Sequence, residues 1–224
     1  MMTIRSYEDG CAAAHALDLI GERWALLVVR ELLLGPKRFT DLRAGLPNVS
    51  PNVLAQRLRE LEQAGVVRRR KLPPPAASKV YELTEWGMGL EPVIVRLARW
   101  GSRSPSKPRD AALGVDSLVL SFRTMFDPRA AEGLTASYEL SLGEDRFRAE
   151  VVDGHFEIAR GVADRADATI ETDPATLAAL VYESRDLAEA LRSGDVRIEG
   201  DRSKVERFLT LFPLPEPAAS TAGA

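Results

Sequence analysis

The chain has 224 residues, of which 45% are hydrophobic and 28% are charged, and this composition excludes a fibrous or a disordered protein. The length exceeds the roughly 100 to 150 residues of a common single domain, so we expect two domains. No apolar run approaches the roughly 20 residues that cross a bilayer, and the first ten residues lack the pattern of a signal peptide, which favours a cytoplasmic protein without a membrane partner.

Cysteine and histidine usage excludes several kinds of site. The single cysteine, Cys11, can form neither an internal disulfide nor a thiolate zinc site, and His15 and His155 are far apart in the sequence. No set of nucleophile, base and orienting residue is present either. We therefore expect no metal, no cofactor and no enzyme activity.

Charge divides the chain into two halves of opposite sign. Residues 1–109 contain 18 Lys and Arg and 11 Asp and Glu, a net charge of +7, whereas residues 110–224 contain 12 and 22, a net charge of −10. Only the first half suits a polyanion. A Ser- and Pro-rich stretch marks the change of sign, so we predict domains over 1–104 and 113–212, a linker over 105–112 and a disordered tail over 213–224.

In the first half, helices are predicted over 13–20 and 24–34, and a short helix begins at Phe39. Ser50 and Pro51, an N-cap hydroxyl and a first-turn proline, open the next helix, which ends near Ala64. Strands over 66–72 and 80–83 flank a proline-rich tip. This order of elements predicts a mainly α winged helix-turn-helix domain.

The helix that Ser50 opens has an apolar stripe of leucines and, on the opposite side, Asn52, Gln56 and Arg59. Asn and Gln can pair with adenine and Arg with guanine in the major groove, although any solvated helix face can carry these residues. The basic hairpin that follows favours contact with double-stranded DNA, with Arg57 on the flank of the helix, closer to a phosphate. The predicted DNA-contacting residues are Arg38, Thr40, Ser50, Asn52, Gln56, Arg57, Arg59, Arg68, Arg69, Arg70, Lys71 and Lys79.

Residues 11–101 resemble the HxlR-type branch of winged-helix regulators. The motif residues are Cys11, Leu17, Ile20, Gly21, Trp24, Arg38, Phe39, Leu42, Ser50, Leu54, Arg57, Leu58, Leu61, Gly65, Tyr81, Leu83, Thr84, Gly87, Trp100 and Gly101. The resemblance implies a homodimer, formed by the first and last helices of this domain, that binds a pseudo-palindromic operator. Glu22 and Arg23 depart from the family pattern, and so does the proline-rich wing tip.

Cys11 precedes the first helix, and two interpretations remain open. In the HxlR-type family this cysteine is sometimes an oxidant or electrophile sensor, and a helix N-terminus lowers a thiol pKa by stabilising the thiolate. The alternative is a small buried hydrophobic residue. Cys11 is therefore a redox-sensing candidate only.

In the second half, helices and alternating strands predict an α+β domain with helices packed on a mostly antiparallel sheet. It resembles sterol carrier proteins through Ala166, Ala168, Thr169, Ile170, Asp173, Pro174, Leu177, Gly194, Gly200 and Asp201. The resemblance implies an apolar tunnel for fatty acyl or sterol-like molecules. The candidate ligand-binding residues are Phe122, Phe126, Leu177, Leu180, Val181, Leu187, Leu191, Phe208 and Phe212. Most of them can equally be plain core.

Three hypotheses follow. The first is a transcriptional regulator whose operator affinity an apolar effector changes through the second domain. The second keeps DNA binding, makes the second domain a non-sensing oligomerisation module and places control at Cys11. The third is a lipid carrier whose basic domain binds DNA without sequence preference.

Overall fold

The computed structural model describes residues 6–75, 77–106 and 113–219, and the chain divides into two compact units, 1–94 and 95–224. The division falls inside one helix, α6 (Glu91–Ser102). The predicted linker, 105–112, lies mostly outside the described residues.

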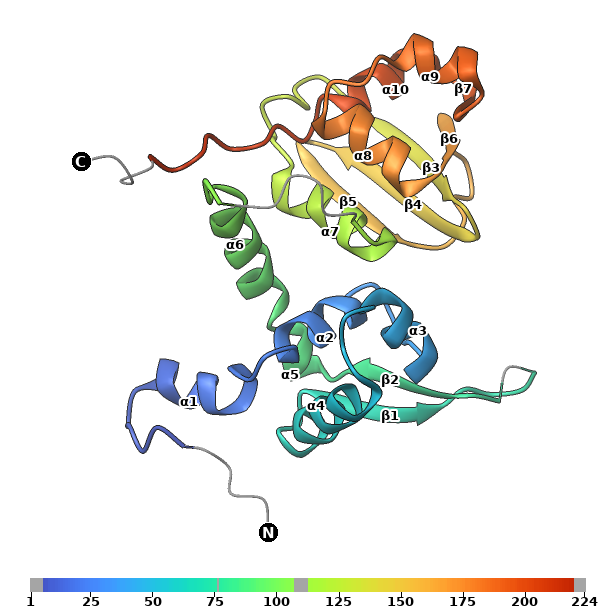
Figure 1. Ribbon diagram of the computed structural model, residues 1–224. Helices are drawn as coiled ribbons and strands as arrows, with labels where there is room; N and C mark the ends of the chain where they lie inside the picture. Colours follow the sequence, from blue (N-terminus) through green and yellow to red (C-terminus); the bar gives the residue numbers. More distant parts are fainter. Residues whose placement is uncertain (1–5, 76, 107–112, 220–224) are drawn as a thin grey trace. The chain divides into compact units, whose positions relative to one another are not determined.

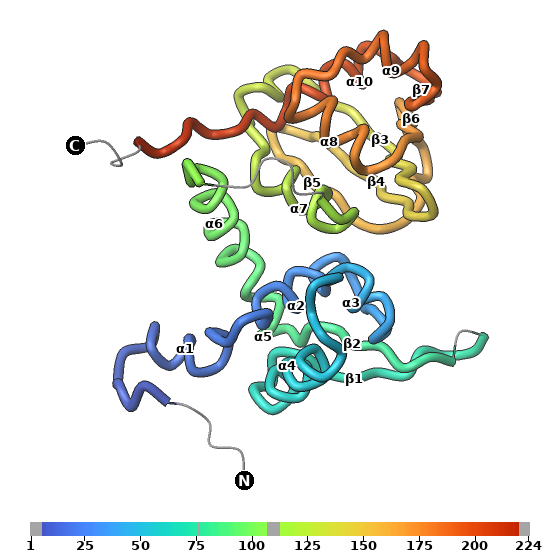
Figure 2. Tube along the Cα trace, viewed as in Figure 1, coloured from blue at the N-terminus to red at the C-terminus, as the bar shows by residue number. Residues whose placement is uncertain are grey.

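The first unit is a winged helix, as predicted. Its elements are α1 (Ala12–Ile20), α2 (Ala25–Leu32), α3 (Phe39–Gly45), α4 (Pro51–Gln63), β1 (Val67–Lys71), β2 (Lys79–Leu83), α5 (Glu85–Met88) and the start of α6 (Figure 1). The antiparallel strands β1 and β2 form a hairpin that extends away from α2, α3 and α4 (Figure 2). Val28, Leu42 and Leu58 are completely buried, so the core lies where the three helices meet.

Helix α5 is not among the predicted elements, and α6 is the last helix that the HxlR-type resemblance implies. Local contacts explain where α5 begins. The Thr84 hydroxyl accepts a hydrogen bond from the Gly87 amide at 3.0 Å and donates to the Gly65 carbonyl oxygen at 2.7 Å. A Cβ atom at position 87 would lie 2.1 Å from the Val66 carbonyl oxygen. The Thr-x-x-Gly motif therefore fixes α5 against the start of the hairpin.

The second unit is a two-layer α+β fold. Its elements are α7 (Val115–Met125), β3 (Ala136–Leu142), β4 (Asp145–Val152), β5 (His155–Arg160), β6 (Ala168–Thr172), α8 (Pro174–Tyr182), α9 (Leu187–Ser193), β7 (Val196–Gly200) and α10 (Arg202–Leu209). The strand order is β5-β4-β3-β6-β7; β3 and β6 are parallel and the other neighbours antiparallel. The sheet is therefore mixed, with antiparallel pairs in the majority as expected.

One face of this sheet is buried and the other faces solvent. Along β4, Phe147, Ala149 and Val151 are buried, whereas Arg146 and Arg148 on the opposite face are exposed. This period of two is typical of a sheet that is covered by helices on one side only. The buried side holds the core of the second unit.

The segment 213–219 of the predicted tail forms no helix or strand. The Ala218 amide donates to the Arg103 carbonyl oxygen at 2.8 Å, and Arg103 Nε donates to the Glu216 carbonyl oxygen at 3.0 Å.

Among the described residues, no helix is long and apolar enough to cross a membrane, and no cluster of His, Cys, Asp and Glu could hold a metal ion.

Candidate functional site

Helix α4 is fixed at its start by its cap and along its length by its leucines. The Ser50 hydroxyl accepts a hydrogen bond from the Val53 amide at 3.3 Å, and Pro51 occupies the first turn. Leu54, Leu58 and Leu61 are at most 1% exposed. The predicted N-cap and packing stripe are confirmed, and Ser50 thereby has a structural role whether or not it contacts DNA.

The opposite side of α4 carries the predicted reading residues. Asn52 and Arg59 are exposed, and Gln56 is half-buried. Gln56 Nε2 donates to Glu60 Oε1 at 3.0 Å. Because a carboxylate only accepts hydrogen bonds, this contact fixes which end of the Gln56 amide faces Glu60. No described residue donates a hydrogen bond to the Gln56 amide oxygen, so this oxygen is available as an acceptor.

The surroundings of Arg57 differ from those predicted from the sequence. Its side chain is 10% exposed, and Nη1 lies 2.5 Å from Glu60 Oε2 and 3.5 Å from Glu22 Oε2. The Arg57 side chain is therefore buried and does not extend from the flank into solvent, and its contact with a phosphate stays a prediction. Arg57 instead packs between α4 and the turn before α2, because its long side chain reaches two carboxylates there.

The wing arginines are paired with carboxylates that the sequence analysis did not single out. Arg68 Nε and Arg70 Nε each donate at 2.8 Å to a different oxygen of Glu82. Burial raises the pKa of Glu82, but the hydrogen bonds from Arg70 and Arg68 outweigh it and the net pKa is lowered. The cross-strand register, which puts Glu82 opposite Arg68, is the sequence signal that could have found this residue.

The other face of the hairpin carries three more predicted cations. Arg69 Nη2 lies 2.9 Å from Glu62 Oε2, and its guanidinium lies over the Tyr81 ring. Lys71 and Lys79 are opposite each other in the register, and both are exposed. The cations of β1 thus point to both faces of the hairpin.

Arg38 and Thr40 lie at the start of α3. Both are exposed, and Arg38 Nε donates to Ser78 Oγ at 3.1 Å, which connects the helix-turn-helix to the wing. The Thr40 hydroxyl donates to Asp41 Oδ1 at 3.2 Å. The fold thus brings the start of α3, one side of α4 and the hairpin into one unit, and Arg57 is the predicted contact whose side chain is buried.

Cys11 is the N-cap residue of α1, and its side chain is exposed. The backbone amides of Ala14 and Ala13 stabilise the thiolate and lower the pKa of Cys11. The interpretation of Cys11 as a small buried hydrophobic residue is therefore wrong. The thiol is exposed to solvent at the N-terminus of α1.

The predicted ligand-binding residues of the second unit gather in its core. Phe122, Phe208 and Phe212 are at most 1% exposed, and their ring centroids lie 4.6 to 5.7 Å apart. Phe126 is half-buried and stacks on Phe156 at 5.3 Å. Leu177 and Leu180 are buried, and Val181, Leu187 and Leu191 are half-buried. The aromatic members form a packed cluster.

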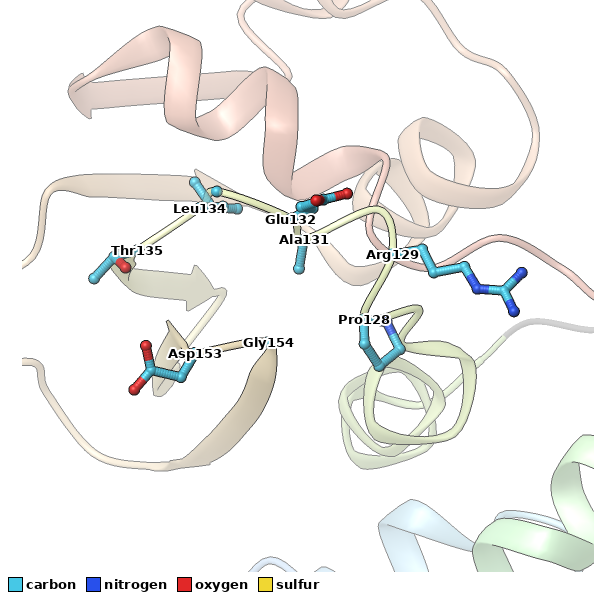
Figure 3. A pocket seen from close by; sticks show the side chains of 9 residues that line it. Pro128, Arg129, Ala131, Glu132, Leu134, Thr135, Asp153 and Gly154 are labelled. Atoms are coloured by element: carbon cyan, nitrogen blue, oxygen red, sulfur yellow. The ribbon is translucent and has the colours of Figure 1, made fainter.

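A cavity of about 480 Å³ lies in the second unit (Figure 3). It is lined by seven residues between α7 and β3 and by two residues of the β4–β5 turn: Pro128, Arg129, Ala131, Glu132, Gly133, Leu134, Thr135, Asp153 and Gly154. None of its lining residues belongs to the predicted ligand-binding set.

The first unit has the fold of the winged helix-turn-helix DNA-binding proteins, and the comparisons with known proteins agree. The HxlR-like helix-turn-helix family model matches residues 19–108. HTH-type transcriptional regulator YvaP of Bacillus subtilis is 40% identical over 87 residues, which are 39% of this chain and 81% of YvaP. YodB of the same organism is 39% identical over 88 residues, 39% of this chain and 79% of YodB. The chain belongs to the HxlR-like helix-turn-helix family of transcriptional regulators.

Among solved structures, the reduced form of YodB from Bacillus subtilis is 35% identical to this chain, with a TM-score of 0.39. The match covers 44% of this chain and 97% of the YodB chain. The second half matches a different model, the Alkyl sulfatase C-terminal family, over residues 111–218. The predicted sterol-carrier identity of this half is not confirmed. Its fold is α+β with a mixed sheet.

Proposed function

We propose that the protein regulates transcription as a homodimer that binds a pseudo-palindromic operator. In this proposal α4 enters the major groove, where Asn52, Gln56 and Arg59 contact base edges, and the β1–β2 hairpin lies against the phosphate backbone. The observation that carries it is the exposed polar side of α4 in the same unit as a hairpin with five exposed cations.

The homodimer is supported by apolar side chains that the chain leaves in solvent. On α6, Val93 is 49% exposed, Leu97 47% and Trp100 76%, and their spacing of four and three residues puts them on one helix face. Leu17 on α1 is 50% exposed. A helix face of this kind is typical of a surface that a second subunit covers.

Selection from a random library of DNA duplexes tests the operator. We expect enrichment of an inverted repeat whose half-sites are centred about one helical turn, roughly 10 base pairs, or a multiple of it, apart. Light scattering of the protein with the selected duplex should give two chains per duplex. Enrichment without symmetry, or one chain per duplex, would contradict the homodimer.

The same measurement separates this function from a lipid carrier with a nonspecific basic domain. A regulator should bind its selected operator at least about 1000-fold more tightly than unrelated DNA. A carrier should bind all duplexes equally and lose that binding steeply with salt. Equal affinity for all sequences would therefore favour the carrier.

We further propose that an apolar effector, fatty acyl or sterol-like, binds the second unit and changes operator affinity. Support comes from the aromatic cluster and from the cavity between the segment that joins α7 to β3 and the β4–β5 turn. The tight packing of Phe122, Phe208 and Phe212 favours instead a non-sensing oligomerisation module.

Titration with a fluorescent fatty acid, with and without operator, decides between these two roles. Fatty-acid binding that weakens or strengthens when operator is added supports effector control, because coupling between two sites is reciprocal. Saturable binding that operator leaves unchanged, or no binding, supports the oligomerisation module.

Cys11 offers a second route of control, and its exposed thiol with a lowered pKa supports this route. Treatment with a quinone or with diamide should reduce operator binding of the natural protein and leave Cys11→Ser unaffected. Equal loss of binding in both proteins would exclude Cys11 as the sensor.

A further inference from the structure

Two arginines of the wing share one carboxylate. Arg68 and Arg70 lie on the same face of β1, and Glu82 stands opposite Arg68 on β2. Arg68 Nε donates to Glu82 Oε1 and Arg70 Nε to Glu82 Oε2, each at 2.8 Å. The Glu82 side chain is only 12% exposed, whereas those of Arg68 and Arg70 are 65% and 45% exposed. The carboxylate therefore lies beneath two guanidinium groups that face solvent.

Which guanidinium nitrogen pairs with Glu82 determines which N–H donors of Arg68 and Arg70 remain available for another acceptor. Each guanidinium has five N–H donors, and Glu82 engages only the Nε edge. Among the described residues, no hydrogen bond engages an Nη group of Arg68 or Arg70. Two Nη edges are thus held near each other with free donors. Phosphate oxygens are the acceptors that such planar donor pairs match best.

Arg69 provides a contrast within the same strand. Its Nη2 group, at the outer edge of the guanidinium, is paired with Glu62 at 2.9 Å, and its side chain points to the other face of the hairpin. Glu62 thus occupies the edge that a phosphate would use, whereas Glu82 leaves that edge free. A glutamate beside a wing arginine can therefore compete with a phosphate or orient the arginine for it.

We propose that Glu82 is a positioning residue that holds Arg68 and Arg70 as a two-guanidinium clamp for a phosphate of the DNA backbone. The clamp rests on the DNA-binding function proposed above. The three side chains together carry one net positive charge, so the site still attracts an anion. Glu82 fixes the rotamers of two long side chains before DNA arrives, which reduces the conformational entropy that is lost on binding.

The test uses the full-length protein and a mixed-sequence DNA duplex of about 30 base pairs, roughly three helical turns, because a phosphate clamp needs no operator. Dissociation constants are measured over a range of salt concentrations for the natural protein, Glu82→Gln, Arg68→Lys/Arg70→Lys and the triple variant. Thermal melting verifies that each variant is folded. Glu62→Gln serves as the matched control.

We expect Glu82→Gln to bind the duplex about five- to twentyfold more weakly, because the two arginines lose their orientation. Its salt dependence should be unchanged, because no cation is removed. Arg68→Lys/Arg70→Lys keeps both charges without the planar donor edges, so it should weaken binding similarly, and adding Glu82→Gln to it should cause no further loss. Glu62→Gln should not weaken binding.

Tighter binding by Glu82→Gln would show that Glu82 competes with DNA and would overturn the clamp. The clamp is also overturned if Glu82→Gln weakens DNA binding by the same factor in the natural protein and in Arg68→Lys/Arg70→Lys. If Glu82→Gln does not fold, Arg68→Lys/Arg70→Lys decides alone, because its altered side chains are exposed, and unchanged binding by this variant overturns the clamp. No binding of the natural protein at low salt would instead refute the proposed function together with the clamp.

Discussion

Two arginines of α4, separated by one residue, should respond in opposite ways to truncation. Arg57 is buried and paired with Glu60 and Glu22. Arg59 is exposed and has no hydrogen bond or ion pair to any described residue. We therefore expect Arg57→Ala to lower stability and Arg59→Ala to lower operator affinity.

The structure limits the size of the stability effect. Breaking a fully buried ion pair costs about 3 to 5 kcal/mol, because it leaves a buried charge without a partner. Here the carboxylates are partly hydrated already, since Glu60 is 31% and Glu22 54% exposed. We therefore expect Arg57→Ala to reduce the free energy of unfolding by about 1 to 2 kcal/mol, between the values for exposed and buried pairs. Arg59→Ala should change it by less than about 0.5 kcal/mol.

Urea unfolding and operator binding together test this assignment. Arg57→Ala should lower the urea midpoint at an unchanged m-value and leave the operator affinity of the folded protein unaltered. Arg59→Ala should keep the midpoint and cost about 1 to 3 kcal/mol at the operator, with little effect on unrelated DNA. The packing role of Arg57 is refuted if Arg57→Ala keeps its midpoint while its salt slope falls by about 0.9, the value for one lost phosphate contact.

The aromatic cluster, Cys11 and two tyrosines of the second unit provide three further tests. Phe208→Ala should destabilise the second unit by about 3 to 5 kcal/mol, measured by calorimetry, because the ring is fully buried among other aromatic rings; a loss below about 1 kcal/mol would disprove a packed cluster. The Cys11 thiol should react with iodoacetamide at a lower pH in the folded chain than in urea, because its pKa is lowered, and identical pH profiles would contradict this. Burial raises the pKa of Tyr138 and Tyr182 to about 12. The stability that these neutral phenols provide should therefore be present below about pH 10 and be lost as pH rises toward about 12. Urea unfolding at each pH measures this, and a constant free energy of unfolding over that range would refute the shift.

Short-range patterns made much of the fold predictable. Ser50 and Pro51 mark the start of α4 because a hydroxyl cap and a first-turn proline act on adjacent residues. Asp153 and Gly154 mark the β4–β5 turn because both residues adopt positive φ angles there. The leucine spacing of α4 likewise identifies its buried face, because side chains three and four residues apart share one side of a helix.

The partners of the candidate interface depended on the tertiary structure. Glu60 lies on the same helix as Arg57, whereas Glu22 approaches from another segment, and only the tertiary structure shows that the Arg57 side chain is buried. Likewise, the cationic strand was evident from the sequence, but the identity of each partner depends on hairpin register and on the reach of α4.

For this protein, the sequence by itself determined a winged helix with a basic wing, an acidic α+β half and an α4 with one apolar and one polar side. These properties follow from periodicity, capping and charge, which operate within a few residues. The tertiary structure decided which cations remain available, since ion pairs join side chains that are distant along the chain. Glu82, which holds Arg68 and Arg70 from the opposite strand, is the contact that only the folded hairpin could provide.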